Sequence, residues 1–306
     1  MLSVVVPMYN ESEGFTLFFD RLTPILENIT KDWEVICVND GSTDDTLKLM
    51  QAASHADKRI KYISLSRNFG KEIALTAGLH QAFGQAVIPI DADLQDPPEL
   101  ITEMVGQWQK GFKVVLATRT KRDDDTWFKR NSAELFYKLM SKLTRYGIPA
   151  NTGDYRLMDA QVVDVIRLLP ERSRFMKGLF AWVGFSTTTL YFERQPRTKG
   201  HTKQNVWTLW QLAKDGIFSF TVFPLRVCVY LGILISLVSF AYAAWLIIRT
   251  VIFGVEVPGY ASIMTAILCM GGIQLLSLGI IGEYIGRIYR ESKQRPLYII
   301  EEQSEI

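Results

Sequence analysis

The chain has 306 residues, of which 34 are basic and 32 are acidic, so its formal net charge at neutral pH is only +2. So small a charge excludes the strongly basic footprint of a general nucleic-acid-binding protein, and we expect no nucleic-acid partner. The three cysteines, Cys37, Cys228 and Cys269, show neither zinc-ligand nor disulfide spacing, which favours a reducing, cytoplasmic setting.

The first half of the chain alternates β-forming runs with helix-like segments. Apolar runs predict strands at residues 2–7, 33–39, 60–64, 86–90 and 113–118. Helix-like segments separate them at residues 11–28, 43–53, 70–83 and 97–110. This alternation predicts an α/β fold with a mostly parallel sheet flanked by helices. The usual glycine-rich dinucleotide and P-loop motifs do not occur, so a nucleotide must be held in another way.

The ends of the first two predicted strands carry polar residues. Tyr9 and Glu11 follow the first strand, and Asn39-Asp40-Gly41-Ser42 ends the second. An aspartate at a strand end can accept hydrogen bonds from a base N–H or from ribose hydroxyls, and Tyr9 offers an aromatic face. The second motif is also ordinary turn and N-cap composition, so each motif alone is weakly informative.

The most informative motif is Asp91-Ala92-Asp93-Leu94-Gln95-Asp96, directly after the predicted strand at residues 86–90. Ligands of open α/β sheets bind beyond the carboxyl ends of strands, so we expect these carboxylates to face a cleft. Asp91 and Asp93 can offer hard oxygen ligands to Mg²⁺ or Mn²⁺, which would bridge to diphosphate oxygens. The alternative is that they are loop or capping residues, and for Asp96 we favour that alternative.

The second half contains two long uncharged stretches. Residues 227–248 would form a helix about 33 Å long, enough to cross a bilayer, and residues 257–282 form the second stretch. Their charge-free length disfavours the alternative of two buried core helices. One basic residue, Arg249, lies between the stretches, whereas four follow the second: Arg287, Arg290, Lys293 and Arg295. This bias predicts that both ends of the hairpin are cytoplasmic.

Residues 205–224 precede the first stretch with apolar side chains at helical spacing, including Val206, Trp210 and Ile217. This spacing predicts an amphipathic helix, which fits the membrane interface and the surface of a soluble domain equally well. Its position next to the first span favours the interface. The N-terminus lacks the basic flank and the length of a secretory signal, so we expect the first half to stay in the cytoplasm.

Five motifs occur in a fixed order along the chain. They are Val6-Pro7-Met8-Tyr9-Asn10-Glu11, Asn39-Asp40-Gly41-Ser42-Thr43-Asp44, Arg67-Asn68-Phe69-Gly70-Lys71, Asp91-Ala92-Asp93-Leu94-Gln95-Asp96-Pro97-Pro98-Glu99 and Thr152-Gly153-Asp154-Tyr155-Arg156-Leu157. With these motifs the chain resembles the polyprenyl-phosphate glycosyltransferases of glycosyltransferase family 2, most of all bactoprenol glucosyltransferases, which are related to dolichol-phosphate mannosyltransferases. The resemblance extends over roughly the whole chain, including the two spans.

The resemblance implies a GT-A domain, a divalent ion (Mg²⁺ or Mn²⁺) and inverting transfer from a UDP-sugar to a polyprenyl phosphate. It implies donor contacts from Pro7, Tyr9, Glu11, Asp40, Lys71, Asp91, Arg119 and Arg130. It implies metal and diphosphate contacts from Asp91, Asp93 and Gln95, with Asp93 in the catalytic set. The implied organisation is a cytoplasmic GT-A domain at 1–204, an interfacial region at 205–224, two transmembrane helices within 225–288 and a cytoplasmic tail at 289–306.

Asp154 is the candidate base implied by the resemblance. A phosphate monoester has a second pKa near ~6, so the acceptor is largely ionised at neutral pH and base strength matters little. Arg156 would set the geometry of Asp154 or meet a phosphate. An internal structural pair of these two residues is an equally good interpretation of the sequence.

A basic run before the spans, with Arg197, Lys199, His201 and Lys203, is placed to draw a phosphate from the membrane surface. The resemblance implies lipid-phosphate contacts from Arg197 and Lys203. The run departs from the family pattern at Gln204, where a tyrosine is usual. The alternative is a solvated juxtamembrane run that attracts anionic lipids.

We therefore expect a membrane-bound hexosyltransferase of the bacterial inner membrane, with both termini cytoplasmic, that supplies lipid-linked glucose for O-antigen or surface-glycan modification. The alternatives are transfer of another sugar, such as mannose or an aminosugar, and a non-catalytic scaffold that senses nucleotide sugars. Glycines such as Gly272, Gly279 and Gly286 in the second span suggest homo-oligomerisation.

Overall fold

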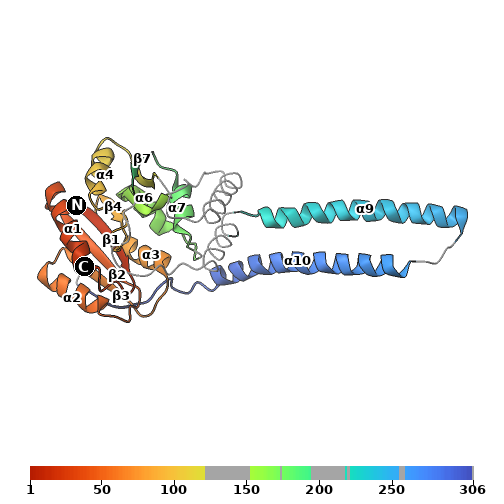
Figure 1. Cartoon of the computed structure of the whole chain (residues 1–306), viewed down its shortest axis with the longest axis horizontal. Coiled ribbons are helices and arrows are strands. Elements are labelled where there is room, and N and C mark those ends of the chain that lie inside the picture. Colours follow the sequence, from red (N-terminus) through yellow and green to blue (C-terminus); the bar gives the residue numbers. More distant parts are fainter. Residues whose placement is uncertain (121–151, 173, 194–217, 219–220, 255–258, 305–306) are drawn as a thin grey trace. The chain divides into compact units, whose positions relative to one another are not determined.

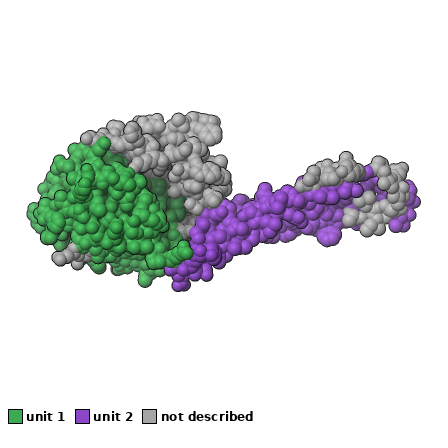
Figure 2. Space-filling model, turned by 90° about the horizontal axis from the view of Figure 1, so that it is seen from below, with its two compact units in different colours: residues 1–213, 295–306 green, residues 214–294 purple. Residues whose placement is uncertain are grey.

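The computed structural model describes residues 1–120, 152–172, 174–193, 218, 221–254 and 259–304. The chain divides into two compact units (Figure 2), one formed by Met1–Ala213 with Arg295–Ile306 and the other by Lys214–Gln294. The first unit therefore contains both terminal segments of the chain, and the second is a single internal segment.

The first unit is built on a mixed sheet. Within the described residues the strand order is β7-β5-β6-β4-β1-β2-β3-β8 (Figure 1). The strands are β1 (Leu2–Met8), β2 (Trp33–Asn39), β3 (Ile60–Leu65), β4 (Ala86–Pro89), β5 (Val114–Arg119), β6 (Thr152–Asp159), β7 (Thr187–Phe192) and β8 (Ile300–Gln303). Strands β6 and β8 run antiparallel to their neighbours, and the other strands share one direction.

Helices connect the strands in the way the alternating sequence predicts. They are α1 (Phe15–Ile29), α2 (Thr46–Ala56), α3 (Lys71–Gln81), α4 (Leu100–Gln109), α6 (Ala160–Leu168) and α7 (Met176–Val183). The first five predicted strands and four predicted helices all occur within a few residues of their expected bounds. The α/β class, with a mostly parallel sheet flanked by helices, is confirmed.

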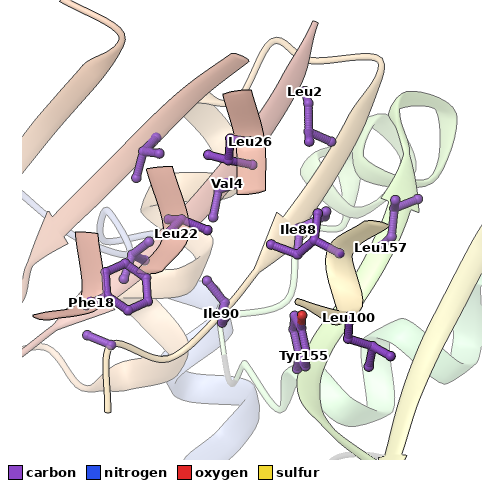
Figure 3. Close-up of a cluster of buried hydrophobic side chains, with 14 of the residues drawn as sticks. Leu2, Val4, Phe18, Leu22, Leu26, Ile88, Ile90, Leu100, Tyr155 and Leu157 are labelled. Carbon is purple, nitrogen blue, oxygen red and sulfur yellow. The ribbon is translucent and has the colours of Figure 1, made fainter. Parts of the chain in front are cut away.

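The central strand β1 is buried on both faces because a helix covers each of them. On one face Val4 joins the core with Phe18, Leu22 and Leu26 of α1, which recur every four residues and so line one side of the helix (Figure 3). On the other face, Val5 packs against α3, whose Gly78 leaves no room for a methyl group. Burial on both faces explains why β1 is a continuous apolar run.

Three strands that the sequence did not predict, β6, β7 and β8, complete the sheet. Strand β6 carries Asp154 and Arg156 and lacks an apolar run, yet it lies between β4 and β5. Strand β8 lies in the segment expected as a cytoplasmic tail and pairs with β3, with Ser304 N–H donating to the Tyr62 carbonyl at 3.0 Å. Such short or charged strands owe their pairing to the neighbouring strand rather than to their own sequence.

The second unit contains two long helices, α9 (Phe223–Phe253) and α10 (Tyr260–Ser292), which run alongside each other in Figure 1. The parts long and apolar enough to cross a membrane are Phe223–Tyr242 and Cys269–Ser292, and neither is buried in the protein. Large apolar side chains are exposed, such as Phe240 at 74% and Leu275 at 72%. Most of the predicted interfacial region at 205–224 lies outside the described residues.

Gly78→Ala tests the packing of α3 on the sheet. A Cβ atom there would lie 2.3 Å from Val5 Cγ1 and 3.0 Å from Val38 Cγ2. Overpacking should destabilise the folded protein by about 1–3 kcal/mol. This loss should outweigh the stabilisation of up to ~1 kcal/mol that the higher helix propensity of alanine gives. We expect a lower thermal unfolding midpoint for the full-length protein in detergent.

The matched control is Gly106→Ala in α4, where an added Cβ meets nothing within 4 Å. The stability of this variant should stay equal or rise. An unchanged midpoint for Gly78→Ala would contradict the packing of α3 described above.

Candidate active site

The candidate site lies at the carboxyl ends of the central parallel strands. Strands β1, β2, β3 and β4 are neighbours of one direction, so the loops that follow them meet at one edge of the sheet. These loops carry four of the five sequence motifs. Strand β6 brings the fifth motif beside β4 from the opposite direction.

The loops after β1 and β2 are joined by side-chain hydrogen bonds. Asn10, in the left-handed region with a φ of 54°, accepts from Thr43 N–H at 2.8 Å, and its own N–H donates to Ser42 Oγ at 3.0 Å. Asp44 accepts from Ser12 N–H at 3.1 Å. Partial burial raises the pKa of Asp44, but its hydrogen bonds from Ser12 and Thr46 outweigh that effect and lower it. The two loops therefore form one braced surface, and sequence reasoning missed these bracing residues.

Asp40 holds the loop after β3 in place. Its carboxylate is buried and accepts from Phe69 N–H at 2.7 Å and from Gly70 N–H at 2.9 Å. Burial raises the pKa of Asp40, and the two backbone hydrogen bonds limit the rise. At Gly41, φ is +65°, and a Cβ would lie 2.4 Å from the Arg67 carbonyl carbon. The Asp40-Gly41 pair thus lets two loops approach each other closely.

The other residues expected at the nucleoside lie on the same loops. Pro7 pairs with Val38 in the β1–β2 register, and Tyr9 follows at the end of β1, half-buried. Glu11 is fixed through its backbone, whose N–H donates to Thr46 Oγ1 at 2.9 Å. The structure brings Pro7, Tyr9, Glu11 and Asp40 to one edge of the sheet, and their contact with a nucleoside stays a prediction.

The acidic loop after β4 separates its side chains into two sets. Asp91, Asp93 and Gln95 are half-buried, whereas the residues between them are buried. Leu94 has a φ of 57°, which is uncommon for a bulky residue and marks a constrained turn. Asp93 Oδ1 accepts from Gln95 N–H at 3.1 Å. The loop therefore presents two carboxylates and one amide on the partly accessible side.

This donor set fits a divalent ion that a substrate helps to hold. Within the described residues no group of three His, Cys, Asp or Glu side chains could form a metal site alone. Mg²⁺ is commonly bound by one or two carboxylates together with substrate phosphates. Asp91 and Asp93, with Gln95 as an additional oxygen ligand, are the residues that would hold such an ion.

Lys71, the first residue of α3, connects this loop to β6. Its ammonium group lies 2.7 Å from Asp91 Oδ2 and 2.9 Å from Asp154 Oδ2. Burial alone would lower the pKa of Lys71, but the two carboxylates outweigh it and raise that pKa well above its usual value. Burial would likewise raise the pKa of Asp154, yet the charges of Lys71, Lys177 and Arg156 lower it well below its usual range. Asp154 is therefore a stable anion with little tendency to accept a proton.

Arg156 supports β6 from within the protein. Its guanidinium group donates to the Gly153 carbonyl at 2.7 Å and lies 4.1 Å from the ring centroid of Phe180. Burial lowers the pKa of Arg156 to about 10, although Asp154 and Glu72 favour its charged form. Arg156 thus holds the backbone directly before Asp154 in place, and its part in the chemistry stays a prediction.

Glu72 is a half-buried acidic residue that the sequence did not single out. Its Oε2 accepts from Met176 N–H at 3.0 Å, at the start of α7. Burial, followed by the charge of Asp154, raises the pKa of Glu72 to about 7. An acidic residue in the first turn of a helix is ordinary, so the sequence carries no signal of this tertiary contact.

The remaining basic residues of the prediction are described only in part. Arg119, at the end of β5, lies 3.7 Å from Asp96 Oδ1 and 3.6 Å from the position of a Cβ on Gly153. Arg119 therefore lies beside the β6 motif. Arg130, Arg197 and Lys203 lie outside the described residues.

Two family models match the chain. Residues 3–167 match the model described as glycosyl transferase family 2, and residues 223–288 match the GtrB C-terminal hairpin. The first match contains all five motifs, and the second contains most of α9 and α10.

Several curated relatives match over nearly the full length. The bactoprenol glucosyl transferase of Shigella phage SfV is 47% identical over 304 residues, which cover 99% of each chain. A prophage bactoprenol glucosyl transferase homolog of Escherichia coli K12 is 47% identical over 299 residues, or 98% of each chain. An uncharacterized glycosyltransferase of Synechocystis, sll0501, is 56% identical over 299 residues, which cover 98% of this chain and 94% of that protein.

A solved structure is similar in fold. It is glucosyl-3-phosphoglycerate synthase from Mycobacterium tuberculosis in complex with Mn²⁺, UDP and glucosyl-3-phosphoglycerate. The TM-score is 0.50 at 20% sequence identity, and the match covers 71% of this chain and 77% of that one. At this identity the similarity supports the GT-A fold of the first unit.

Glu72→Gln tests the titration of the half-buried Glu72 carboxyl group. Because the folded state raises the pKa of Glu72 to about 7, it binds the proton more tightly than the unfolded chain does. The contribution of Glu72 to stability is therefore greatest at low pH and is lost as the pH rises from about 4.5 to about 7. Glutamine keeps an acceptor for Met176 N–H and does not ionise. We expect the thermal midpoint of Glu72→Gln to rise relative to that of the wild type as the pH rises from 5 to 8.

The control for this comparison is Glu103→Gln, a change at an exposed position of α4. Its midpoint should keep a constant difference from the wild type over the same pH range. A constant difference for Glu72→Gln as well would show that Glu72 does not titrate in this way.

Proposed function

Since the chain belongs to glycosyl transferase family 2, we propose that this glycosyltransferase transfers a hexose from a nucleotide sugar to a polyprenyl phosphate. Glucose from UDP-glucose is the preferred donor, because relatives named bactoprenol glucosyl transferase match over 98–99% of this chain. The observation that carries the proposal is the ion-pair bridge from Lys71 to Asp91 and Asp154, because it joins two expected donor residues to the candidate base.

The reaction forms a bond between an acceptor phosphate oxygen and the anomeric carbon, while the bond from that carbon to the donor diphosphate breaks. A divalent ion held by Asp91, Asp93 and Gln95 would neutralise charge on the departing diphosphate. Lys71 adds a positive charge beside the same group. Pro7, Tyr9, Glu11 and Asp40 hold the nucleoside, and Arg119 and Arg130 hold the donor phosphates.

Asp154 acts as an orienting anion in this proposal. A phosphate monoester loses its second proton near pH ~6, so the nucleophile is ionised at neutral pH without a base. The lowered pKa of Asp154 makes the carboxylate a poor proton acceptor. Its charge instead keeps Lys71 in place beside the reacting groups, which favours attack in line and with inversion.

We further propose that α9 and α10 cross the bacterial inner membrane and hold the site on its cytoplasmic face. Their exposed apolar side chains fit a lipid environment. Strand β8 joins the same sheet as β1, so the segments before and after the two helices belong to one unit. Two crossings return the chain to the side where it started, which agrees with cytoplasmic termini. Arg197 and Lys203 would then meet the lipid phosphate, and the product would supply lipid-linked sugar for O-antigen or surface-glycan modification.

The proposal is tested with purified full-length protein, undecaprenyl phosphate and several nucleotide sugars, including UDP-glucose, GDP-mannose and a UDP-aminosugar. We expect mass analysis to find a hexose added to the lipid only with UDP-glucose and only when Mg²⁺ or Mn²⁺ is present. Product from another donor would change the assigned sugar. Nucleotide-sugar binding without product under every condition would contradict the enzyme and favour a sensing scaffold.

Asp154→Asn tests the orienting anion. The change keeps the side-chain shape but removes the charge that Lys71 and Arg156 balance, so we expect turnover to fall by about 10²-fold or more. The affinity for UDP-glucose, measured by calorimetry, should stay within about twofold, because Asp154 is not assigned to the donor. Asp45→Asn, an exposed change in an ion pair with Lys48, serves as the control. Full activity of Asp154→Asn would refute the role.

A further inference from the structure

Helix α7 lies against the candidate site, although no sequence motif and neither matched family segment includes it. Its first residue, Met176, is fully buried and donates its N–H to Glu72, the residue after Lys71. Met176 Sδ also lies 3.6 Å from Thr76 Oγ1 of α3. The start of α7 is therefore anchored to the helix that supplies Lys71.

The second turn of α7 is anchored to β6. Phe180 lies under the Arg156 guanidinium at 4.1 Å, and Arg156 donates to the Gly153 carbonyl beside Asp154. The two contacts hold the first two turns of α7, one through the residue after Lys71 and the other through Arg156 of β6. The orientation of α7 is thus set by the same residues that form the candidate site.

Lys177 is the only charged residue of α7 and follows the anchored Met176 directly. Its side chain is half-buried, and no hydrogen bond or ion pair between described residues involves its ammonium group. The positive charge of Lys177 lowers the pKa of both Asp154 and Glu72. Asp154 Oδ1 is buried and has no hydrogen-bond partner within the part of the chain that the structure describes. A cation is therefore held close to the site while it remains available to a ligand.

The charges around Asp154 indicate which ligand Lys177 would bind. Lys71 is shared between two carboxylates, and Arg156 donates to backbone carbonyls. A phosphate monoester that approaches Asp154 brings nearly two negative charges to a carboxylate. Its binding requires a further positive charge on the Asp154 side, away from the Asp91 loop.

We propose that Lys177 binds the acceptor phosphate beside Asp154, and that Glu72 is a positioning residue that holds Lys177 there through the first turn of α7. This inference rests on the proposed function, since it assigns the acceptor subsite of the same reaction. It adds a phosphate-binding residue from α7 to the basic run at Arg197 and Lys203. It also assigns the Glu72 carboxyl group a purpose that the donor site does not require.

The test compares Lys177→Met and Lys177→Arg in the full-length protein. Lys177→Met would remove a charge-assisted hydrogen bond to the acceptor phosphate. We expect this loss to raise the KM for undecaprenyl phosphate about tenfold or more. The Kd for UDP-glucose and the slow hydrolysis of UDP-glucose without acceptor should stay within about twofold. Lys177→Arg should recover most of the acceptor affinity, because it restores the charge and the donors. Lys48→Met, an exposed change on α2, should alter none of these values.

A second pair of variants tests the positioning. Glu72→Ala removes the acceptor for Met176 N–H and should raise the same KM, whereas Glu72→Gln keeps an acceptor and should raise it less. An equal loss of donor and acceptor affinity in Lys177→Met would overturn the assignment in favour of the donor diphosphate. An unchanged acceptor KM would also overturn it, with the proposed function intact. Failure of the wild type to glycosylate the lipid would overturn both.

Discussion

The ammonium group of Lys71 joins the segments that form the candidate active site at the end of the sheet. Lys71 contacts Asp91 at 2.7 Å and Asp154 at 2.9 Å, and these carboxylates come from a loop and a strand that are more than 60 positions apart in the sequence. Without a shared cation, these two partly buried carboxylates would repel each other. With it, the loop after β4, the start of α3 and β6 are held in one arrangement.

The surrounding loops are braced so that this arrangement exists before a substrate arrives. Asp40 holds the backbone at Phe69 and Gly70, and Asn10 joins the loops after β1 and β2. The left-handed conformation is uncommon for a leucine such as Leu94, whereas asparagine adopts it readily at Asn10, and hydrogen bonds lie around both positions. A site assembled in this way loses little conformational freedom on binding, which is how a protein places charges accurately beside a reacting phosphate.

The path of the chain ties this site to the long apolar helices. The sheet contains both β1 and β8, so the chain leaves the first unit before α9 and re-enters it after α10. The last strand then pairs with β3, and Ile299 accepts from Ser66 N–H at 3.0 Å, next to the loop that Asp40 holds. The proposed reaction, in which a soluble sugar donor meets a lipid-borne acceptor, would make use of this covalent link between the two units.

The sequence by itself determined the parts that depend on local periodicity and on strand ends. Alternation of apolar runs predicted β1 to β5 and the helices between them, and the position of Asp91 after a strand predicted a candidate site at the sheet edge. The tertiary structure alone decided the pairing of Lys71 with both carboxylates, the contact of Glu72 with Met176, and the places of β6 and β8. Burial patterns repeat over neighbouring residues and can be read locally, whereas an ion pair or an added strand depends on which distant segments the fold brings together.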